Sequence, residues 1–179
     1  MTTPRETWSR LSLILGDVVD ALADVGAPVA VSTIEPGMVS WDYCCATDDG
    51  VGQAFIRVVR IVAAEPFPQQ TLVPRSCPPT MAALVEVGVL RCAPTLTSQA
   101  NAPAPAEVTA TAAQVIADMS VVYSVLKGHV PDWALFPTTL DTWSPIGPEG
   151  GCAGGAWQAW IDVAICPPEV TSATSPTSP

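Results

Sequence analysis

The chain has 179 residues, a net charge of −10 and a mean hydropathy of +0.35. This length suits one domain and is too short for two ordinary ones. The six arginines and the single lysine form no cluster, so we expect no site that binds nucleic-acid phosphates. A composition this apolar and this poor in charge instead predicts a surface that is partly buried against other subunits.

The start of the chain and its apolar runs do not indicate export or membrane insertion. Glu6 comes early and no apolar segment follows it directly, unlike the pattern of a signal peptide. No uninterrupted apolar run approaches the ~18–20 residues of a membrane span. We therefore expect a protein that is made and kept in a cytoplasm and has no membrane partner.

The cysteine pattern does not predict a metal site. None of the six cysteines forms a C-x-x-C pair, and the single histidine, His129, is distant from all of them in sequence. In a reducing cytoplasm we expect free, buried thiols, and disulfides formed after the protein leaves the cell are the alternative. The cysteines are Cys44, Cys45, Cys77, Cys92, Cys152 and Cys166.

A first helix is predicted over residues 5–25, where Thr3 and Glu6 fit a capping box and Gly26 ends the helix. Its apolar residues recur every three or four positions, so they form one stripe that faces the core. The stripe comprises Trp8, Leu11, Leu15, Val18, Leu22 and Val25.

A short strand is expected over Val29–Ile34, followed by a turn at Glu35–Gly37 and a loop over Trp41–Gly50. The loop contains the acidic pair Asp48 and Asp49. No third ligand or histidine lies nearby in sequence, so we interpret the pair as part of a solvated turn.

Two long strands are predicted over Gly52–Ala64 and Thr80–Cys92, and they most simply form an antiparallel pair. Strict alternation in the first strand places Arg57 and Arg60 on opposite faces. The segment Glu65–Pro79 between them has five prolines in fifteen residues, which excludes regular structure. It is longer than a hairpin needs, which favours a role in contacting another molecule.

A second helix is predicted over Ala106–Lys127, after an Ala/Pro/Thr-rich connector, and Gly128 is expected to end it. Its apolar stripe comprises Val108, Ala112, Val115, Met119, Val122 and Leu126.

The remaining elements complete the predicted fold. We expect a short strand over Thr138–Trp143, a Gly/Pro loop over Ser144–Gly155 and a last strand over Ala156–Cys166. The order of elements predicts an α+β domain over residues 1–168, with a mixed or mainly antiparallel sheet and two helices on one face. Residues 169–179 form a Ser/Thr/Pro-rich tail that cannot build a core.

No motif for catalysis or cofactor binding is present. The sequence has no Gly-x-Ser-x-Gly, P-loop or dinucleotide fingerprint, and the Gly-rich run at residues 150–155 lacks the Lys, Ser or Thr that phosphate binding requires. A single histidine gives little basis for a Cys–His catalytic pair. We therefore expect a protein that is not an enzyme and has no catalytic, cofactor-binding or metal-binding residues.

The proline-rich segment and the tail are the predicted docking segments. Neither has enough periodic apolar residues to fold on its own contacts, and prolines reduce the entropy that a segment loses on docking. The candidate contact residues are Phe67, Leu72, Val73 and Arg75 in the loop and Val170 in the tail.

Over about residues 5–168 the chain resembles the tail terminator and head-to-tail connector proteins of long-tailed bacteriophages that infect actinobacteria. The order of elements is similar to that of tail terminators. The segments that carry the resemblance are Met81–Pro94, Asp118–Met119, Trp143–Pro148 and Gly151–Trp157.

The resemblance implies a structural virion protein of the tail and neck, assembled in the host cytoplasm. Such proteins form a homo-oligomeric ring, expected to be a hexamer, on the last ring of tail tube protein. The ring stops tube polymerisation and presents a surface to the head-to-tail connector or stopper, while DNA passes through without specific binding. Alternatives are another neck protein, such as a stopper or adaptor, and a small binding module unrelated to phages, which would be monomeric.

Overall fold

The computed structural model describes residues 4–39, 43–45, 52–64, 67–70, 81–95, 102–129 and 138–163. Within this part of the chain, two helices and five strands follow one another in the order α1 (Pro4–Asp24), β1 (Val31–Pro36), β2 (Gln53–Ala63), β3 (Met81–Cys92), α2 (Pro105–His129), β4 (Thr138–Glu149) and β5 (Cys152–Val163).

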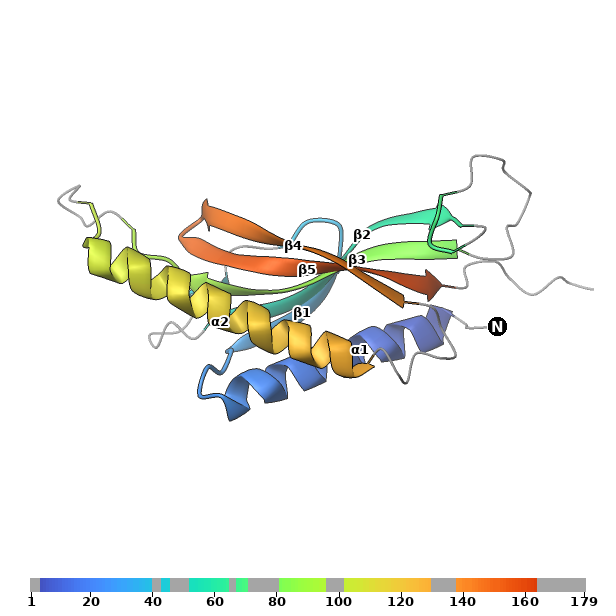
Figure 1. Cartoon of the computed structure of the whole chain (residues 1–179), viewed down its shortest axis with the longest axis horizontal. Coiled ribbons are helices and arrows are strands. Elements are labelled where there is room, and N and C mark those ends of the chain that lie inside the picture. Colours follow the sequence, from blue (N-terminus) through green and yellow to red (C-terminus); the bar gives the residue numbers. More distant parts are fainter. Residues whose placement is uncertain are drawn as a thin grey trace, which may run out of the picture.

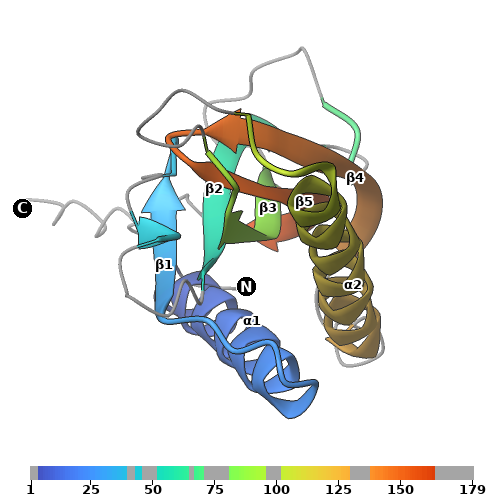
Figure 2. The ribbon, with the colours of Figure 1, turned by 90° about the vertical axis from the view of Figure 1, so that its left-hand side faces the viewer.

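The five strands form one sheet in the order β1-β2-β3-β5-β4. β1 pairs with β2 in parallel, and the other neighbouring strands are antiparallel. Both helices lie on the same face of this sheet, α1 against β1 and β2, and α2 against β3, β5 and β4 (Figure 1, Figure 2). The predicted α+β class, with a mixed sheet and two helices on one face, is confirmed.

α1 packs on the sheet through the middle of its predicted stripe. Leu11, Leu15, Val18 and Leu22 are buried in the main core. The ends of the stripe, Trp8 and Val25, are exposed, so the prediction that they face the core is wrong. The spacing of apolar residues fixes which side of a helix points inward, but the length over which the sheet covers that side depends on the partner strands.

β2 contains a β-bulge, where its register with β3 shifts between Val58 and Arg60. A bulge adds one residue to a strand, so every later side chain changes face. Arg57 therefore pairs with Glu86 and Arg60 with Leu84, two positions on the same face of β3. The prediction from strict alternation, with the two arginines on opposite faces, is wrong for this reason.

β4 and β5 form a long hairpin where a short strand and a Gly/Pro loop were predicted. β4 continues past Trp143 to Glu149, and its prolines are tolerated because β4 is an edge strand, where a missing N–H need not face a neighbour. The turn is Gly150–Gly151, with φ values of 58° and 83°. Positive φ at both positions is typical of the tight type I′ turn, which glycine adopts readily.

The sheet has a second, smaller apolar cluster on the face opposite the helices. Adjacent residues alternate between faces, so Ile56 contacts the helices while Phe55 belongs to the second cluster. Val39 and Cys44 cover this cluster. They belong to the connection between the parallel strands β1 and β2, a crossover that usually contains a helix. The described parts of this connection, residues 37–39, 43–45 and 52, contain no α-helix.

Candidate interaction surface and cysteine cluster

α2 is apolar around most of its circumference, but the sheet covers only part of it. Val122 and Leu126 are buried, whereas Val108 is 51% exposed and Ile116 is 58% exposed. Figure 1 shows the first half of α2 running past the end of α1. The predicted stripe faces the sheet from Val115 onward, because the first turns of α2 extend beyond the elements that would cover Val108.

The exposed apolar residues of α2 lie on one side of the helix. Ile116 and Tyr123 are seven residues apart, about two turns, so their side chains line up, whereas Val108 lies about 80° around the helix from Ile116, on the stripe that faces the core further along α2. No charged residue occurs between Glu107 and Asp118. We call these three residues the α2 apolar face.

A buried ion pair fixes α2 to the sheet. Asp118 is 3% exposed, and its two carboxylate oxygens accept hydrogen bonds from Nε and Nη2 of Arg91 at 2.7 and 2.9 Å. Gln114 donates a further hydrogen bond to Asp118 at 3.0 Å. Arg91, at the end of β3 and 8% exposed, also donates to the carbonyl oxygens of Ala27 and Pro28 after α1. One guanidinium thus joins α2, β3 and the connection from α1 to β1.

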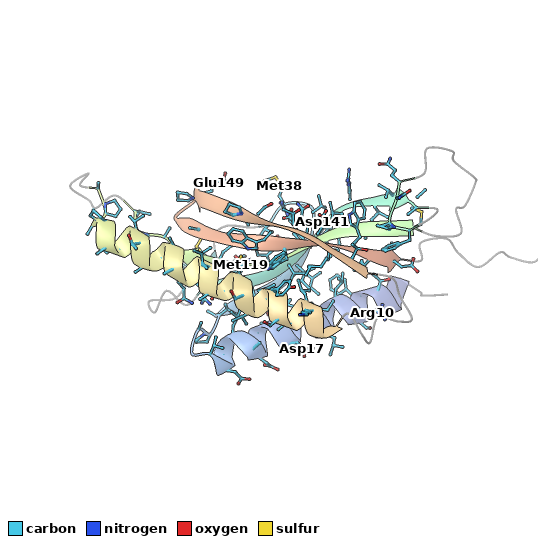
Figure 3. The ribbon with its side chains drawn as sticks, in the orientation of Figure 1. Arg10, Asp17, Met38, Met119, Asp141 and Glu149 are labelled. Carbon is cyan, nitrogen blue, oxygen red and sulfur yellow. A yellow bond between two sulfur atoms is a disulfide. The ribbon has the colours of Figure 1, made fainter. Side chains whose placement is uncertain are left out.

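Two tryptophans from the β4–β5 hairpin hold the second half of α2. Trp157 donates from Nε1 to the carbonyl oxygen of Met119 at 3.0 Å, and its ring centroid lies 5.1 Å from that of Tyr123. Met119 lies on the side of α2 that faces the sheet (Figure 3). Trp143 packs over Gly155 so closely that a Cβ at position 155 would clash with the indole ring. The crevice between α2 and these tryptophans has no room for a water molecule, so it is a packed joint rather than a ligand pocket.

The face of the sheet opposite the helices has a polar network. Glu86 is buried and accepts hydrogen bonds from Arg57 at 2.6 Å and from Gln158 at 3.0 Å. The Arg60 guanidinium lies 5.2 Å from the ring centroid of Trp160. The β2 bulge brings Arg60 to this face. The arrangement is structural, because each charge here is paired or stacked and no histidine or cysteine lies among these residues.

Asp162, near the end of β5, has a pKa that burial raises above its ordinary value, although the charge of Arg10 partly opposes this shift. A raised pKa in the folded state means that the charged carboxylate destabilises the fold. That cost is absent below the unfolded-state pKa of about 3.9 and grows as the pH rises through the folded-state pKa.

Asp162→Asn is therefore expected to increase the free energy of unfolding at neutral pH and to leave it unchanged near pH 3. Urea unfolding at the two pH values measures this difference. Asp141→Asn, which removes the same charge from an exposed position on β4, is the control. A loss of stability at neutral pH, or an equal gain at both pH values, would contradict the expectation.

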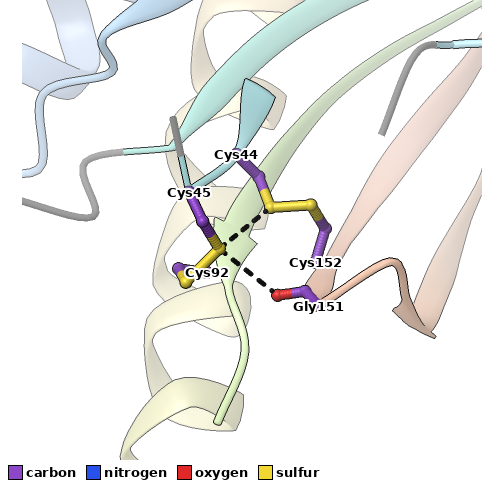
Figure 4. The surroundings of a disulfide bond; sticks show 5 residues. All are labelled: Cys44, Cys45, Cys92, Gly151 and Cys152. Atoms are coloured by element: carbon purple, nitrogen blue, oxygen red, sulfur yellow. Dashed lines mark hydrogen bonds between the residues drawn. A yellow bond between two sulfur atoms is a disulfide. The ribbon is translucent and has the colours of Figure 1, made fainter. Parts of the chain in front are cut away.

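Four cysteines meet at the end of the sheet where β3 ends and β5 begins (Figure 4). Cys44 is disulfide-bonded to Cys152 and Cys45 to Cys92, with Cα–Cα distances of 5.9 and 4.9 Å. The Sγ atoms of Cys44 and Cys45 are 3.4 Å apart. The expectation of free thiols is therefore wrong for these four residues. It rested on the redox compartment, whereas the fold brings the four side chains together. Cys77 and Cys166 lie outside the described residues.

The predicted docking residues are mostly outside the described part of the chain. Leu72, Val73, Arg75 and Val170 all lie there. Phe67 is described and half-buried, in a short segment whose Gln70 forms an antiparallel bridge with Ala64 at the end of β2.

Sequence reasoning missed the Arg91–Asp118 pair and the cysteine cluster. The pair had a signal: Asp118 is the only charged residue between Glu107 and Lys127. A lone acid within an apolar helix indicates a buried partner, and Arg91, the one charge near the end of an apolar strand, is the natural candidate.

Among the described residues, one helical stretch, Pro105–Gly128, is long and apolar enough to cross a membrane by length and composition. The expectation that no segment meets this criterion considered only uninterrupted apolar runs. α2 meets it because most of the polar residues scattered along this apolar helix are uncharged Thr, Ser and Gln. Its buried Asp118 and its contact with Trp157 instead hold it against the sheet.

No protein-family model matches the chain, and no curated protein matches it.

Proposed function

We propose that this chain is a structural subunit of a bacteriophage tail, of the tail-terminator type, and that it forms a ring capping the tail tube in the virion. The observation that carries this proposal is the α2 apolar face, with Val108, Ile116 and Tyr123 exposed on a helix that has no charge over the ten positions 108–117. The resemblance of the sequence to tail terminators supplies the class of assembly.

The α2 apolar face favours a protein partner over solvent. Large exposed apolar patches are uncommon on monomeric proteins and mark interfaces. The second half of α2 is held against the sheet through Asp118 and Trp157, so the helix is already formed before it docks, which reduces the entropy lost on association. A head-to-tail contact between this face and a different surface of the next subunit closes into a ring when the rotation between subunits allows it.

The sheet edges are less suited to join subunits. β4 is one edge strand and carries Pro145 and Pro148, which have no N–H to donate to an added strand. β1, the other edge, has six residues. The helix face, which has no charge over positions 108–117, is therefore the better candidate for a contact between subunits.

The charge also fits a neck protein. A net charge of −10 repels phosphate, so DNA can pass an acidic ring without binding to it.

The test is the mass of the purified chain by native mass spectrometry, with electron micrographs of the same sample. We expect a closed ring, most simply of six subunits. Ile116→Glu should break it into monomers that keep their fold, because assembly would bury an unpaired charge. Ala23→Glu adds the same charge at an exposed position on α1 and should leave the ring intact. A monomer at micromolar concentration would refute the ring and favour the small binding module.

A second experiment separates the terminator from a stopper or adaptor. A terminator ring added to polymerising tail tube protein should arrest elongation, and micrographs should show it at one end of the tube. A stopper or adaptor would form a ring without arresting the tube.

The proline-rich segment and the tail are proposed to dock the ring on its neighbours. Replacing residues 66–78 by a Gly-Ser linker, and separately ending the chain at Pro168, should leave a folded ring by circular dichroism and native mass. Attachment to the tube or the connector should fail for at least one of the two variants, since contacts repeated around a ring add by avidity. Fully infectious particles from both would show that other surfaces join the ring to its neighbours.

A further inference from the structure

We propose that Cys44, Cys45, Cys92 and Cys152 bind one Zn²⁺ through four thiolates when both disulfides are reduced. This inference does not depend on the proposed function. It rests on four cysteines, from three separate segments, that the fold places at one end of the sheet.

The backbone positions the four side chains independently of the disulfides. Cys92 and Cys152 are directly opposite in the register of β3 and β5, and backbone hydrogen bonds between these strands maintain that position. Ala93 donates from its backbone N to the carbonyl oxygen of Gly151 at 2.7 Å, which extends the pairing past the cysteines. Cys44 and Val39 are buried over Phe55 and Leu90, so apolar contacts keep residues 43–45 beside the strands.

Three of the four sulfur positions are close to those of a zinc–thiolate site. With Zn–S bonds of about 2.3 Å, a tetrahedral site places its sulfur atoms about 3.8 Å apart. The Sγ atoms of Cys44 and Cys45 are 3.4 Å apart, and those of Cys44, Cys45 and Cys152 all lie within 4.8 Å of one another. Cys92, bonded to Cys45, supplies the fourth sulfur. Reduction frees each cysteine side chain to rotate, which opens the S–S pairs toward the zinc spacing.

The burial of the four residues suits a structural metal. Cys44 and Cys152 are buried and Cys45 and Cys92 are exposed, so the ion can enter from solvent and then be half enclosed. Four soft thiolates favour zinc over magnesium or calcium, which prefer oxygen ligands. Four protein ligands leave no open position, so the site would hold the fold together rather than catalyse a reaction.

A dithiol can supply the electrons and protons that reduction of the two disulfides requires. Each disulfide takes up two electrons and two protons from a dithiol that is itself oxidised to its disulfide. Zinc binding then releases the four thiol protons and leaves a dianionic complex. Oxidation of the thiolates by molecular oxygen or another electron acceptor would restore the disulfides and release the ion.

The test uses the full chain, reduced with a phosphine and then supplied with Zn²⁺. After removal of weakly bound metal by a chelating resin, elemental analysis should find one zinc per chain. Cys77→Ser/Cys166→Ser, which removes the cysteines outside the cluster, should keep that stoichiometry. Cys92→Ser/Cys152→Ser should lose the metal. Co²⁺ added to the reduced wild-type chain should give the intense visible bands of a tetrahedral thiolate site, so the proposal is also tested without any variant.

Three results would overturn the proposal of a zinc site. One is a folded, fully reduced chain that retains no zinc and shows no tetrahedral cobalt spectrum. Another is zinc that is lost from the Cys77/Cys166 variant and kept by the Cys92/Cys152 variant. The third is a chain that unfolds as soon as its disulfides are reduced, whether or not zinc is present.

Discussion

Asp118→Ala is expected to lower the free energy of unfolding by about 3–5 kcal/mol, because it leaves the buried charge of Arg91 without its partner. Arg91 would keep its hydrogen bonds to the carbonyl oxygens of Ala27 and Pro28, but two neutral acceptors do not balance a guanidinium that is 8% exposed. The loss is large against the 5–15 kcal/mol that stabilises a typical domain. Urea unfolding at a fixed protein concentration measures it.

Two further variants test whether the unpaired charge of Arg91 causes the loss of stability in Asp118→Ala. Glu107→Ala removes the same charge from the same helix, at an exposed position whose carboxylate only accepts from the Ala104 N–H, and should cost about 1 kcal/mol or less. The double variant Arg91→Met/Asp118→Leu replaces the pair by apolar side chains and should recover most of the stability lost in Asp118→Ala. A cost below about 1 kcal/mol for Asp118→Ala would mean that the pair is not desolvated in solution.

The Arg91–Asp118 pair also bears on assembly. α2 presents its apolar face only while it is held against the sheet, and Asp118 lies two residues from Ile116 on that helix. Loosening the pair should therefore weaken ring formation even at conditions where the chain remains folded.

Local patterns were sufficient to predict α1, the long β2–β3 pair and α2, because α1 has one clear helical period and the others are long apolar runs bounded by segments rich in Pro or Gly. They failed where the outcome depends on the partner strand. The bulge at Val58–Arg60 is one extra residue, visible only once β3 supplies the register. The second half of β4 was interpreted as loop because Pro145 and Pro148 normally exclude a strand, and they are compatible with one here only because β4 lies at an edge.

The candidate site was less predictable, because its parts are distant in sequence. Cys44 and Cys152 are 108 residues apart, and spacing rules for metal sites detect only ligands that are close along the chain. Ile116 lies beside the predicted core-facing stripe, so its exposure agrees with the helical pattern, whereas the exposure of Val108, a stripe residue, depends on where the sheet ends. The choice of Phe67 and Val170 as docking residues remains a prediction.

Removing the Cys44–Cys152 disulfide with Cys44→Ala/Cys152→Ala is expected to cost about 4–5 kcal/mol, and Cys45→Ala/Cys92→Ala about 4 kcal/mol, by the chain-entropy estimate for their loops. The loops span 108 and 47 residues. They overlap, so removing both disulfides should cost less than the sum of the two effects.

Unfolding of the oxidised variants in denaturant, followed by tryptophan fluorescence, measures these losses. Cys77→Ser/Cys166→Ser is the control that should unfold like the parent chain.

The two disulfides differ in their surroundings. Cys44 and Cys152 are buried in the second apolar cluster with Phe55 and Leu90, so alanine there also leaves a small cavity. Cys45 and Cys92 are exposed, so their loss is chiefly one of chain entropy. Removing the buried disulfide should therefore be the more costly change, and the reverse order would show that the crossover between β1 and β2 is held mainly through Cys45.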